Sequence, residues 1–159
     1  MRTAFFHGLE SPPVSEKNAI LDKHFTDVYA PPMDYRDSEV FSRVLQEVTE
    51  NRPDVLIGSS MGGWFAYCLS TLTGIPTLLF NPACVGRSFN PAIKTGGELP
   101  QQTVILGKYD DVINHQESMS WMVDNYHGPM SFTYEGIGHR IPVDIFEKRI
   151  ANFIKKTNI

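Results

Sequence analysis

Cysteine is scarce in this chain, with two in 159 residues. Cys68 falls in a predicted helix and Cys84 in a predicted loop, and their spacing does not match a metal-binding motif. The simplest interpretation is a pair of buried, reduced thiols in a cytoplasmic protein. We therefore expect no metal site.

Positive charge is also in short supply. The 14 lysines and arginines are outnumbered by 18 aspartates and glutamates, which gives a formal net charge of −4. This balance argues against a nucleic-acid partner or an anionic membrane surface. No apolar run approaches the roughly 20 residues of a membrane span, so we expect none. The apolar start, residues 1–6, is too short for a signal peptide and predicts a strand.

What the sequence does have is a regular alternation of short apolar segments and helical patterns, with a length that suits one domain over residues 1–159. This alternation predicts an α/β fold with a mostly parallel sheet of about six strands, in a three-layer αβα arrangement. Strands are expected near residues 3–6, 28–30, 54–59, 77–80, 103–106 and 130–134. Helices are expected near residues 15–25, 40–48, 62–72, 114–124 and 143–156, with Ser38 as the N-cap of the second.

The most informative stretch is residues 58–62, Gly-Ser-Ser-Met-Gly, which fits Gly-x-Ser-x-Gly with Ser60 at the centre. An apolar strand precedes it and an apolar helix follows, as a nucleophile elbow requires. Gly58 and Gly62 lack a Cβ, so the strand and the helix can approach closely around the serine. The alternatives are an ordinary strand-to-helix turn or a phosphate-binding turn.

An acid and a histidine follow the serine at later strand ends. A serine hydroxyl needs an imidazole to take its proton, and the imidazole needs a carboxylate to orient it. His139 follows the last predicted strand and is the candidate base. Asp110 and Asp111 are both candidates for the acid, and Asp110 is preferred. His7 precedes the nucleophile in the chain, and we interpret it as a residue that shapes its loop.

Two backbone N–H groups are candidates for an oxyanion hole. They belong to Met61, directly after the serine, and to Leu9, in the loop after the first strand. Gly8 lets the backbone approach a reacting carbonyl group and is therefore a candidate for substrate binding.

Five segments of the chain together resemble the small bacterial YqiA-like esterases, a minimal branch of the α/β-hydrolase superfamily. The resemblance covers nearly the whole chain, although Leu9 stands where the family usually has an aromatic residue and Glu10 where it has a polar one. It implies Ser60 as nucleophile, Asp110 as acid and His139 as base. It also implies hydrolysis of carboxylic esters or thioesters without a cofactor. The segments that carry it are residues 6–12, 58–63, 81–83, 110–112 and 138–139.

The interval between residues 80 and 103 leaves no room for a large lid domain, which predicts a shallow, open pocket. Its candidate acyl contacts are Cys84, Val85 and Phe89, with packing beneath a short loop as the equally weighted alternative. The function predicted is a serine hydrolase acting on esters or thioesters with small to medium acyl groups. An acyltransferase or amidase with the same triad, and a non-catalytic binding protein on a hydrolase scaffold, are the alternatives.

Overall fold

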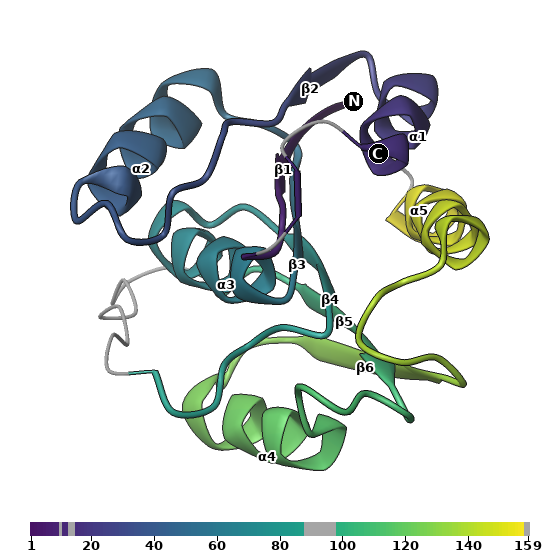
Figure 1. The fold of residues 1–159 in the computed structure, drawn as a ribbon. Helices are drawn as coiled ribbons and strands as arrows, with labels where there is room; N and C mark the ends of the chain where they lie inside the picture. The colour runs from purple at the N-terminus through teal and green to yellow at the C-terminus, as the bar shows by residue number, and fades with distance from the viewer. Residues whose placement is uncertain (10, 13–14, 88–97, 158–159) are drawn as a thin grey trace.

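The computed structural model describes residues 1–9, 11–12, 15–87 and 98–157 (Figure 1). Strands and helices alternate along this part of the chain, as the sequence predicts. The strands are β1 (Arg2–Phe6), β2 (Asp27–Tyr29), β3 (Val55–Ser59), β4 (Thr77–Phe80), β5 (Gln102–Gly107) and β6 (Met130–Glu135). The helices are α1 (Glu16–His24), α2 (Val40–Asn51), α3 (Met61–Thr73), α4 (His115–Asn125) and α5 (Val143–Thr157).

All six strands form one open sheet in the order β2-β1-β3-β4-β5-β6, and every neighbouring pair is parallel. This confirms the expected α/β architecture. The next strand after β1, which is β2, pairs with one edge of β1, and the following strand, β3, pairs with the other edge. The strand order therefore reverses between β1 and β3. In open parallel sheets, ligands bind outside the carboxyl ends of the strands at such a reversal.

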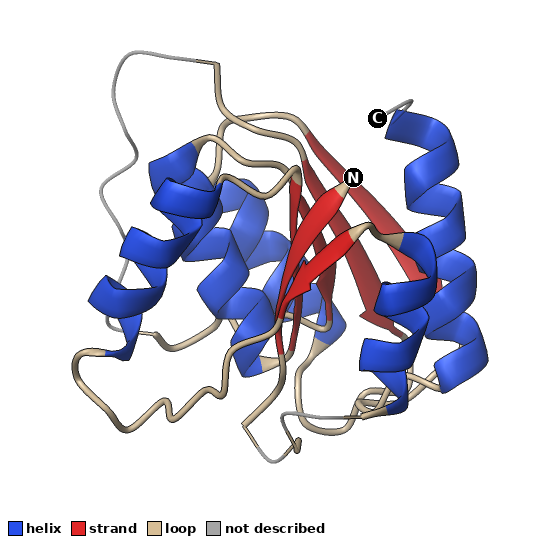
Figure 2. Cartoon of the chain, turned by 90° about the horizontal axis from the view of Figure 1, so that it is seen from above, coloured by secondary structure: helices blue, strands red, loops and turns tan. Residues whose placement is uncertain are grey.

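Helices cover both faces of the sheet, which gives the three layers seen from above in Figure 2. Side chains alternate along each strand, because successive residues point to opposite faces. Leu56, for example, packs with the helices α2, α3 and α4, whereas its neighbours Val55 and Ile57 pack with α1 and α5. The middle strands are buried on both sides, which is why their sequences are nearly continuous apolar runs.

The start of α2 differs from the expectation. The predicted N-cap was Ser38, but the helix begins at Val40. A preceding turn is held instead by Asp37, whose carboxylate accepts a hydrogen bond from the Glu39 N–H at 3.0 Å. An aspartate side chain competes well for nearby backbone donors, so it fixes the turn one residue before the serine.

No helix in the described residues is both long and apolar enough to cross a membrane.

Candidate active site

Ser60 lies between β3 and α3 in a backbone conformation that non-glycine residues rarely adopt. Its φ is 55° and its ψ is −117°. Three hydrogen bonds hold it there: its N–H donates to Phe80 O at 2.9 Å, and its carbonyl accepts from Trp64 N at 3.1 Å and Ala83 N at 3.0 Å. Strain of this kind costs on the order of 1–3 kcal/mol and persists only where the surroundings enforce it. The surroundings here are β4 and α3 itself.

Two glycines make the sharp turn around Ser60 sterically feasible. A Cβ on Gly58 would lie 2.2 Å from Gly62 O, and a Cβ on Gly62 would lie 2.0 Å from Phe6 O. Either contact is far inside the van der Waals limit. The absence of side chains at these positions therefore lets the N-terminus of α3 pack directly against the ends of β3 and β1.

The imidazole of His139 connects Ser60 to a carboxylate. Its Nε2 lies 3.0 Å from Ser60 Oγ, and its Nδ1 lies 2.8 Å from Asp110 Oδ2. Asp110 follows β5 and His139 follows β6, so the three side chains come from three different strand ends. The Asp110 side chain is fully buried, whereas 21% of the His139 side chain remains exposed. A carboxylate at Nδ1 favours the tautomer that carries its proton there and leaves Nε2 free to accept one.

The loop after β5 distinguishes the two adjacent aspartates. Asp110 Oδ1 accepts hydrogen bonds from the backbone N–H groups of Val112 and Ile113, both at 2.8 Å. Its other oxygen is thereby aimed at His139. Asp111 is exposed to solvent. The N-cap of α4 is Asn114, whose Oδ1 accepts from Gln116 N at 2.9 Å and Glu117 N at 3.2 Å.

Asn81, at the end of β4, ties the acid loop to the base loop. Its Oδ1 accepts from Gly107 N at 2.7 Å, and its Nδ2 donates to Gly138 O at 3.2 Å and His139 O at 3.1 Å. The residue is 1% exposed and has a φ of 43°. Sequence reasoning placed Asn81 at a strand end but gave it no role. The sequence signal that could have identified this role is its position in the chain. Asn81 follows β4, and β4 lies between the strands that precede Ser60 and Asp110.

His7 anchors the loop after β1. Its Nδ1 lies 2.7 Å from Gly8 O, and its Nε2 accepts a hydrogen bond from Met33 N at 3.2 Å. The tautomer consistent with both contacts carries the proton on Nδ1. The Tyr35 hydroxyl donates to His7 O. Burial raises the pKa of Tyr35, so this hydroxyl keeps its proton at neutral pH. The ring of His7 is therefore engaged in holding the loop.

A cavity of about 610 Å³ opens beside Ser60 and His139. Gly8, the candidate for substrate binding, and Leu9 and Met61, the candidates for the oxyanion hole, line it. Among the described residues, the N–H groups of Leu9 and Met61 donate no hydrogen bond to another group. Within this part of the chain, both remain candidates for an oxyanion hole.

The cavity wall differs from the expected one in the segment after β4. Ala83 and Arg87 line the cavity, whereas Cys84 and Val85 do not. Cys84 is fully buried among the core residues, which agrees with the alternative interpretation of packing beneath a loop. Val85 is 44% exposed. Phe89 lies outside the described residues. Sequence reasoning also missed Lys17 and Arg140, which lie in the cavity wall, because α1 and the segment before α5 meet there only after folding.

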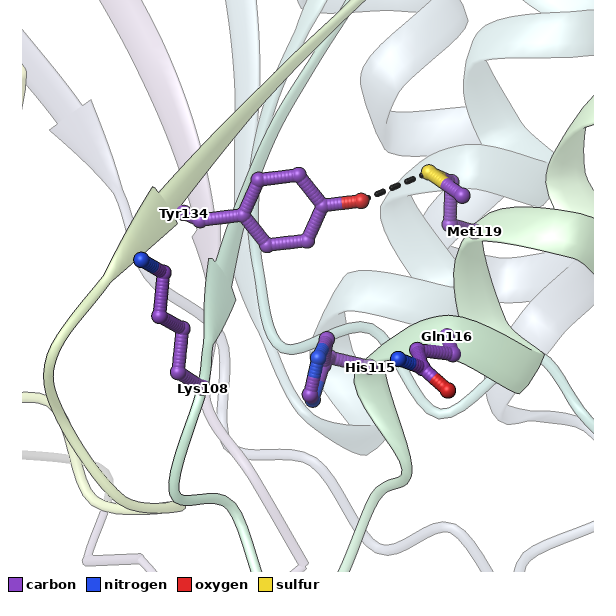
Figure 3. A pocket seen from close by; sticks show the side chains of 5 residues that line it. All are labelled: Lys108, His115, Gln116, Met119 and Tyr134. Atoms are coloured by element: carbon purple, nitrogen blue, oxygen red, sulfur yellow. Dashed lines mark hydrogen bonds between the residues drawn. The ribbon is translucent and has the colours of Figure 1, made fainter.

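A second hollow lies between α4 and the carboxyl-terminal part of β5 and β6 (Figure 3). Its wall includes Lys108, His115 and Tyr134, and the Tyr134 hydroxyl donates to Met119 Sδ at 2.7 Å. Its described lining residues include no serine or cysteine. Over residues 1–9, 11–12, 15–87 and 98–157, no three histidine, cysteine, aspartate or glutamate side chains are grouped so as to hold a metal ion.

Solved structures share this fold at low sequence identity. A Xanthomonas campestris protein described as a hydrolase of the alpha/beta superfamily superposes with a TM-score of 0.71 at 19% identity, over 98% of both chains. The Bacillus cereus carboxylesterase gives a TM-score of 0.68 at 17% identity, over 96% of this chain and 87% of the other. Est1E from Butyrivibrio proteoclasticus, with bound ferulic acid, gives 0.69 at 12% identity, over 98% of this chain and 88% of the other.

Sequence comparison gives the family. No curated protein sequence matches the chain. The model of the Uncharacterised protein family (UPF0227) matches residues 3–123, which include β1, the Gly58–Gly62 turn and the Asp110 loop. This match extends over most of the chain and agrees with the resemblance to YqiA-like proteins. The chain therefore belongs to the UPF0227, or YqiA, family, and it has the α/β-hydrolase fold.

Proposed function

We propose that the protein is a serine hydrolase that cleaves carboxylic ester or thioester bonds of small to medium acyl groups. The observation that carries the proposal is the pair of hydrogen bonds that joins Ser60 Oγ to His139 Nε2 and His139 Nδ1 to Asp110 Oδ2. A nucleophile, a base and an orienting acid at hydrogen-bond distance are the set that acyl transfer needs.

In the first half of the reaction, Ser60 Oγ attacks the carbonyl carbon while His139 Nε2 takes the hydroxyl proton. Asp110 stabilises the imidazolium that forms. The N–H groups of Leu9 and Met61 bind the oxyanion of the tetrahedral intermediate. One such donor is worth about 3–4 kcal/mol in a serine protease. His139 then gives its proton to the departing alcohol or thiol, which leaves an acyl-enzyme.

In the second half, water enters the site. His139 takes a proton from it, the hydroxide adds to the acyl carbon, and collapse of the second intermediate releases the acid and restores Ser60. The partly exposed imidazole supports this step, since solvent has access to the base. A cavity of about 610 Å³ suits an acyl group of modest size.

The test is labelling with a fluorophosphonate probe followed by peptide mass spectrometry. We expect the label on Ser60 in the wild type and none on Ser60→Ala. Loss of a triad serine costs on the order of a million-fold in kcat in the subtilisin example. Ser59→Ala is the matched control, because Ser59 is the adjacent serine and ends β3, and this variant should keep most of its activity.

Two results would contradict the proposal. One is a folded wild type that neither reacts with the probe nor hydrolyses any of a series of 4-nitrophenyl esters. The other is an equal loss of activity in both serine variants when circular dichroism shows both to be folded. Product analysis with added alcohols distinguishes hydrolysis from acyl transfer to another acceptor.

A further inference from the structure

Among the described residues, the wall of the cavity beside Ser60 has a charge opposite to that of the whole chain. These residues contribute three cationic side chains, those of Lys17, Arg87 and Arg140, and one acidic side chain, that of Glu16. The chain as a whole has a formal net charge of −4. A cleft lined by one sign of charge concentrates ligands of the other sign. This cavity therefore favours an anion.

Lys17 carries the strongest argument. Among the described residues no carboxylate forms an ion pair with it, and its Nζ lies 5.3 Å from the ring centroid of Phe146 on α5. The side chain is partly buried, and this burial lowers the pKa of its ammonium group. A partly desolvated cation gains more from a bound anion than an exposed one does. Lys17 lines the cavity, so an anion bound there can reach its side chain.

Arg140 also lines the cavity, and it precedes α5, the helix that packs against α1, which carries Lys17. It directly follows His139, and the chain continues from it through Ile141 and Val143, both in the cavity wall, into α5. In the described part of the chain, the Arg140 guanidinium makes no hydrogen bond or ion pair. Its planar set of N–H donors matches a carboxylate or a phosphate.

Arg87, in the segment after β4, also lines the cavity. Its Nε donates to Ala83 O at 3.1 Å, and among the described residues its outer nitrogens make no hydrogen bond or ion pair. In the proposed reaction His139 gives its proton to the departing alcohol or thiol, so that part of the substrate lies beside His139. Arg140 is the next residue in the chain and lines the same cavity, which makes it the cation of choice for this part of the substrate.

We propose that the substrate carries a carboxylate or phosphate on its alcohol or thiol part, and that Arg140 and Lys17 bind this anion. The inference rests on the proposed function and names its substrate class. The anion remains on the leaving group throughout, and the reaction neither forms nor breaks a bond to it.

The test compares two pairs of esters, with rates on Ser60→Ala subtracted as background. The first pair is the butyryl ester of 4-hydroxybenzoate and the butyryl ester of methyl 4-hydroxybenzoate, which places the charge on the leaving group. The second pair is the mono-4-nitrophenyl ester of adipate and its methyl ester, which places the charge on the acyl group. The quantity measured is the ratio of kcat/KM for the charged ester to that for the neutral one.

We expect a ratio above 1 for the first pair and a decrease of that ratio by about tenfold in Arg140→Gln and in Lys17→Gln, because each variant removes a charged hydrogen-bond donor to the anion. Lys148→Gln is the matched control, because it removes one positive charge from an exposed position of α5 outside the cavity wall. Its ratio should equal that of the wild type. Added salt should also reduce the wild-type ratio, because it screens a partly exposed site.

A ratio at or below 1 for the first pair would overturn the inference, and so would an equal change in all three variants. A charge preference confined to the second pair, and lost in Arg87→Gln, would also overturn it by assigning the anion to the acyl group. In each of these cases hydrolysis of the neutral esters and labelling of Ser60 would continue. If the proposed function itself is wrong, the protein neither hydrolyses the neutral esters nor is labelled at Ser60.

Discussion

The side-chain amide of Asn81 donates a hydrogen bond to the backbone carbonyl of His139, at 3.1 Å. It thereby holds the base by its main chain, while Asp110 holds the imidazole. The same amide accepts from Gly107, three residues before Asp110 in the chain. One buried side chain thus sets the separation of the two loops that carry the acid and the base.

For Asn81→Ala we expect a decrease in kcat of about a hundredfold, because misplacement of a catalytic group by 1 Å can cost that much. Stability should also fall by about 1–3 kcal/mol, because buried groups lose their partners. The measurements are kcat on an activated ester and denaturant unfolding. Asn125→Ala is the control, since Asn125 Nδ2 also donates to a backbone carbonyl, that of Trp121, outside the cavity wall. A kcat loss no larger in Asn81→Ala than in Asn125→Ala would contradict the positioning role.

The adjacent aspartates should respond very differently to the same substitution. In Asp110→Asn the amide oxygen can still accept from Val112 and Ile113, but its NH₂ group then faces His139 Nδ1 and favours the wrong tautomer. We expect kcat to fall by about ten-thousandfold, as in chymotrypsin-like enzymes.

Asp111→Asn should lose less than about tenfold, because Asp111 is exposed. Both variants are assayed on one activated ester at pH 8, with circular dichroism to check folding. A larger loss of kcat in Asp111→Asn than in Asp110→Asn would assign the role of the acid to Asp111. A small loss of kcat in both variants would argue against the triad.

Gly62 should not tolerate even a methyl group. In Gly62→Ala the new Cβ would lie 2.0 Å from Phe6 O, so α3 must move away from β1. Overpacking of this kind costs about 1–3 kcal/mol or more, and the shift would also displace Met61 from the oxyanion position. Thermal unfolding and kcat should both decrease.

Gly136→Ala is the matched control for Gly62→Ala. At position 136 the nearest atom to a Cβ is Tyr109 Cε2 at 3.7 Å, an ordinary contact. Equal unfolding temperatures for the two alanine variants would show that the close approach of α3 and β1 is not what requires glycine.

The two cysteines should be unreactive in the native protein. Burial raises the pKa of both the Cys68 and the Cys84 thiols well above the usual range. The thiolate is the reactive form, so it is nearly absent at neutral pH and becomes available only when unfolding returns the pKa to its ordinary value.

We expect no reaction with Ellman's reagent at pH 8 in the folded state and two equivalents in guanidinium chloride. Rapid stoichiometric reaction of either thiol without denaturant would contradict its burial.

Much of the fold follows from local signals in the sequence. Apolar runs such as residues 77–80 predict buried parallel strands because both faces of these strands are covered. Parallel strands bring their carboxyl ends to one edge, so Ser60, Asp110 and His139 could be expected together from their chain positions alone.

Other features depend on contacts between distant segments and could not be predicted in this way. The choice between Asp110 and Asp111 depends on which carboxylate accepts from the two following N–H groups, and that is a property of the folded turn. The placement of Lys17 in the cavity depends on the packing of α1 against α5. For Cys84 the sequence left an acyl contact and packing beneath a loop equally open; its neighbours Ala83 and Arg87 line the cavity while Cys84 is buried, because a short loop can present only some of its side chains to one side.

The separation of Ser60 and His139 along the chain has a consequence for synthesis. The serine is added 79 residues before the histidine. At roughly 5–20 residues per second, this interval lasts about 4–16 s on the ribosome. During that time the growing chain carries a serine with no base, because β6 and the loop that follows it have not yet been translated. Hydrolytic activity would therefore begin only after the strand that carries the His139 loop has been made and has docked beside β5.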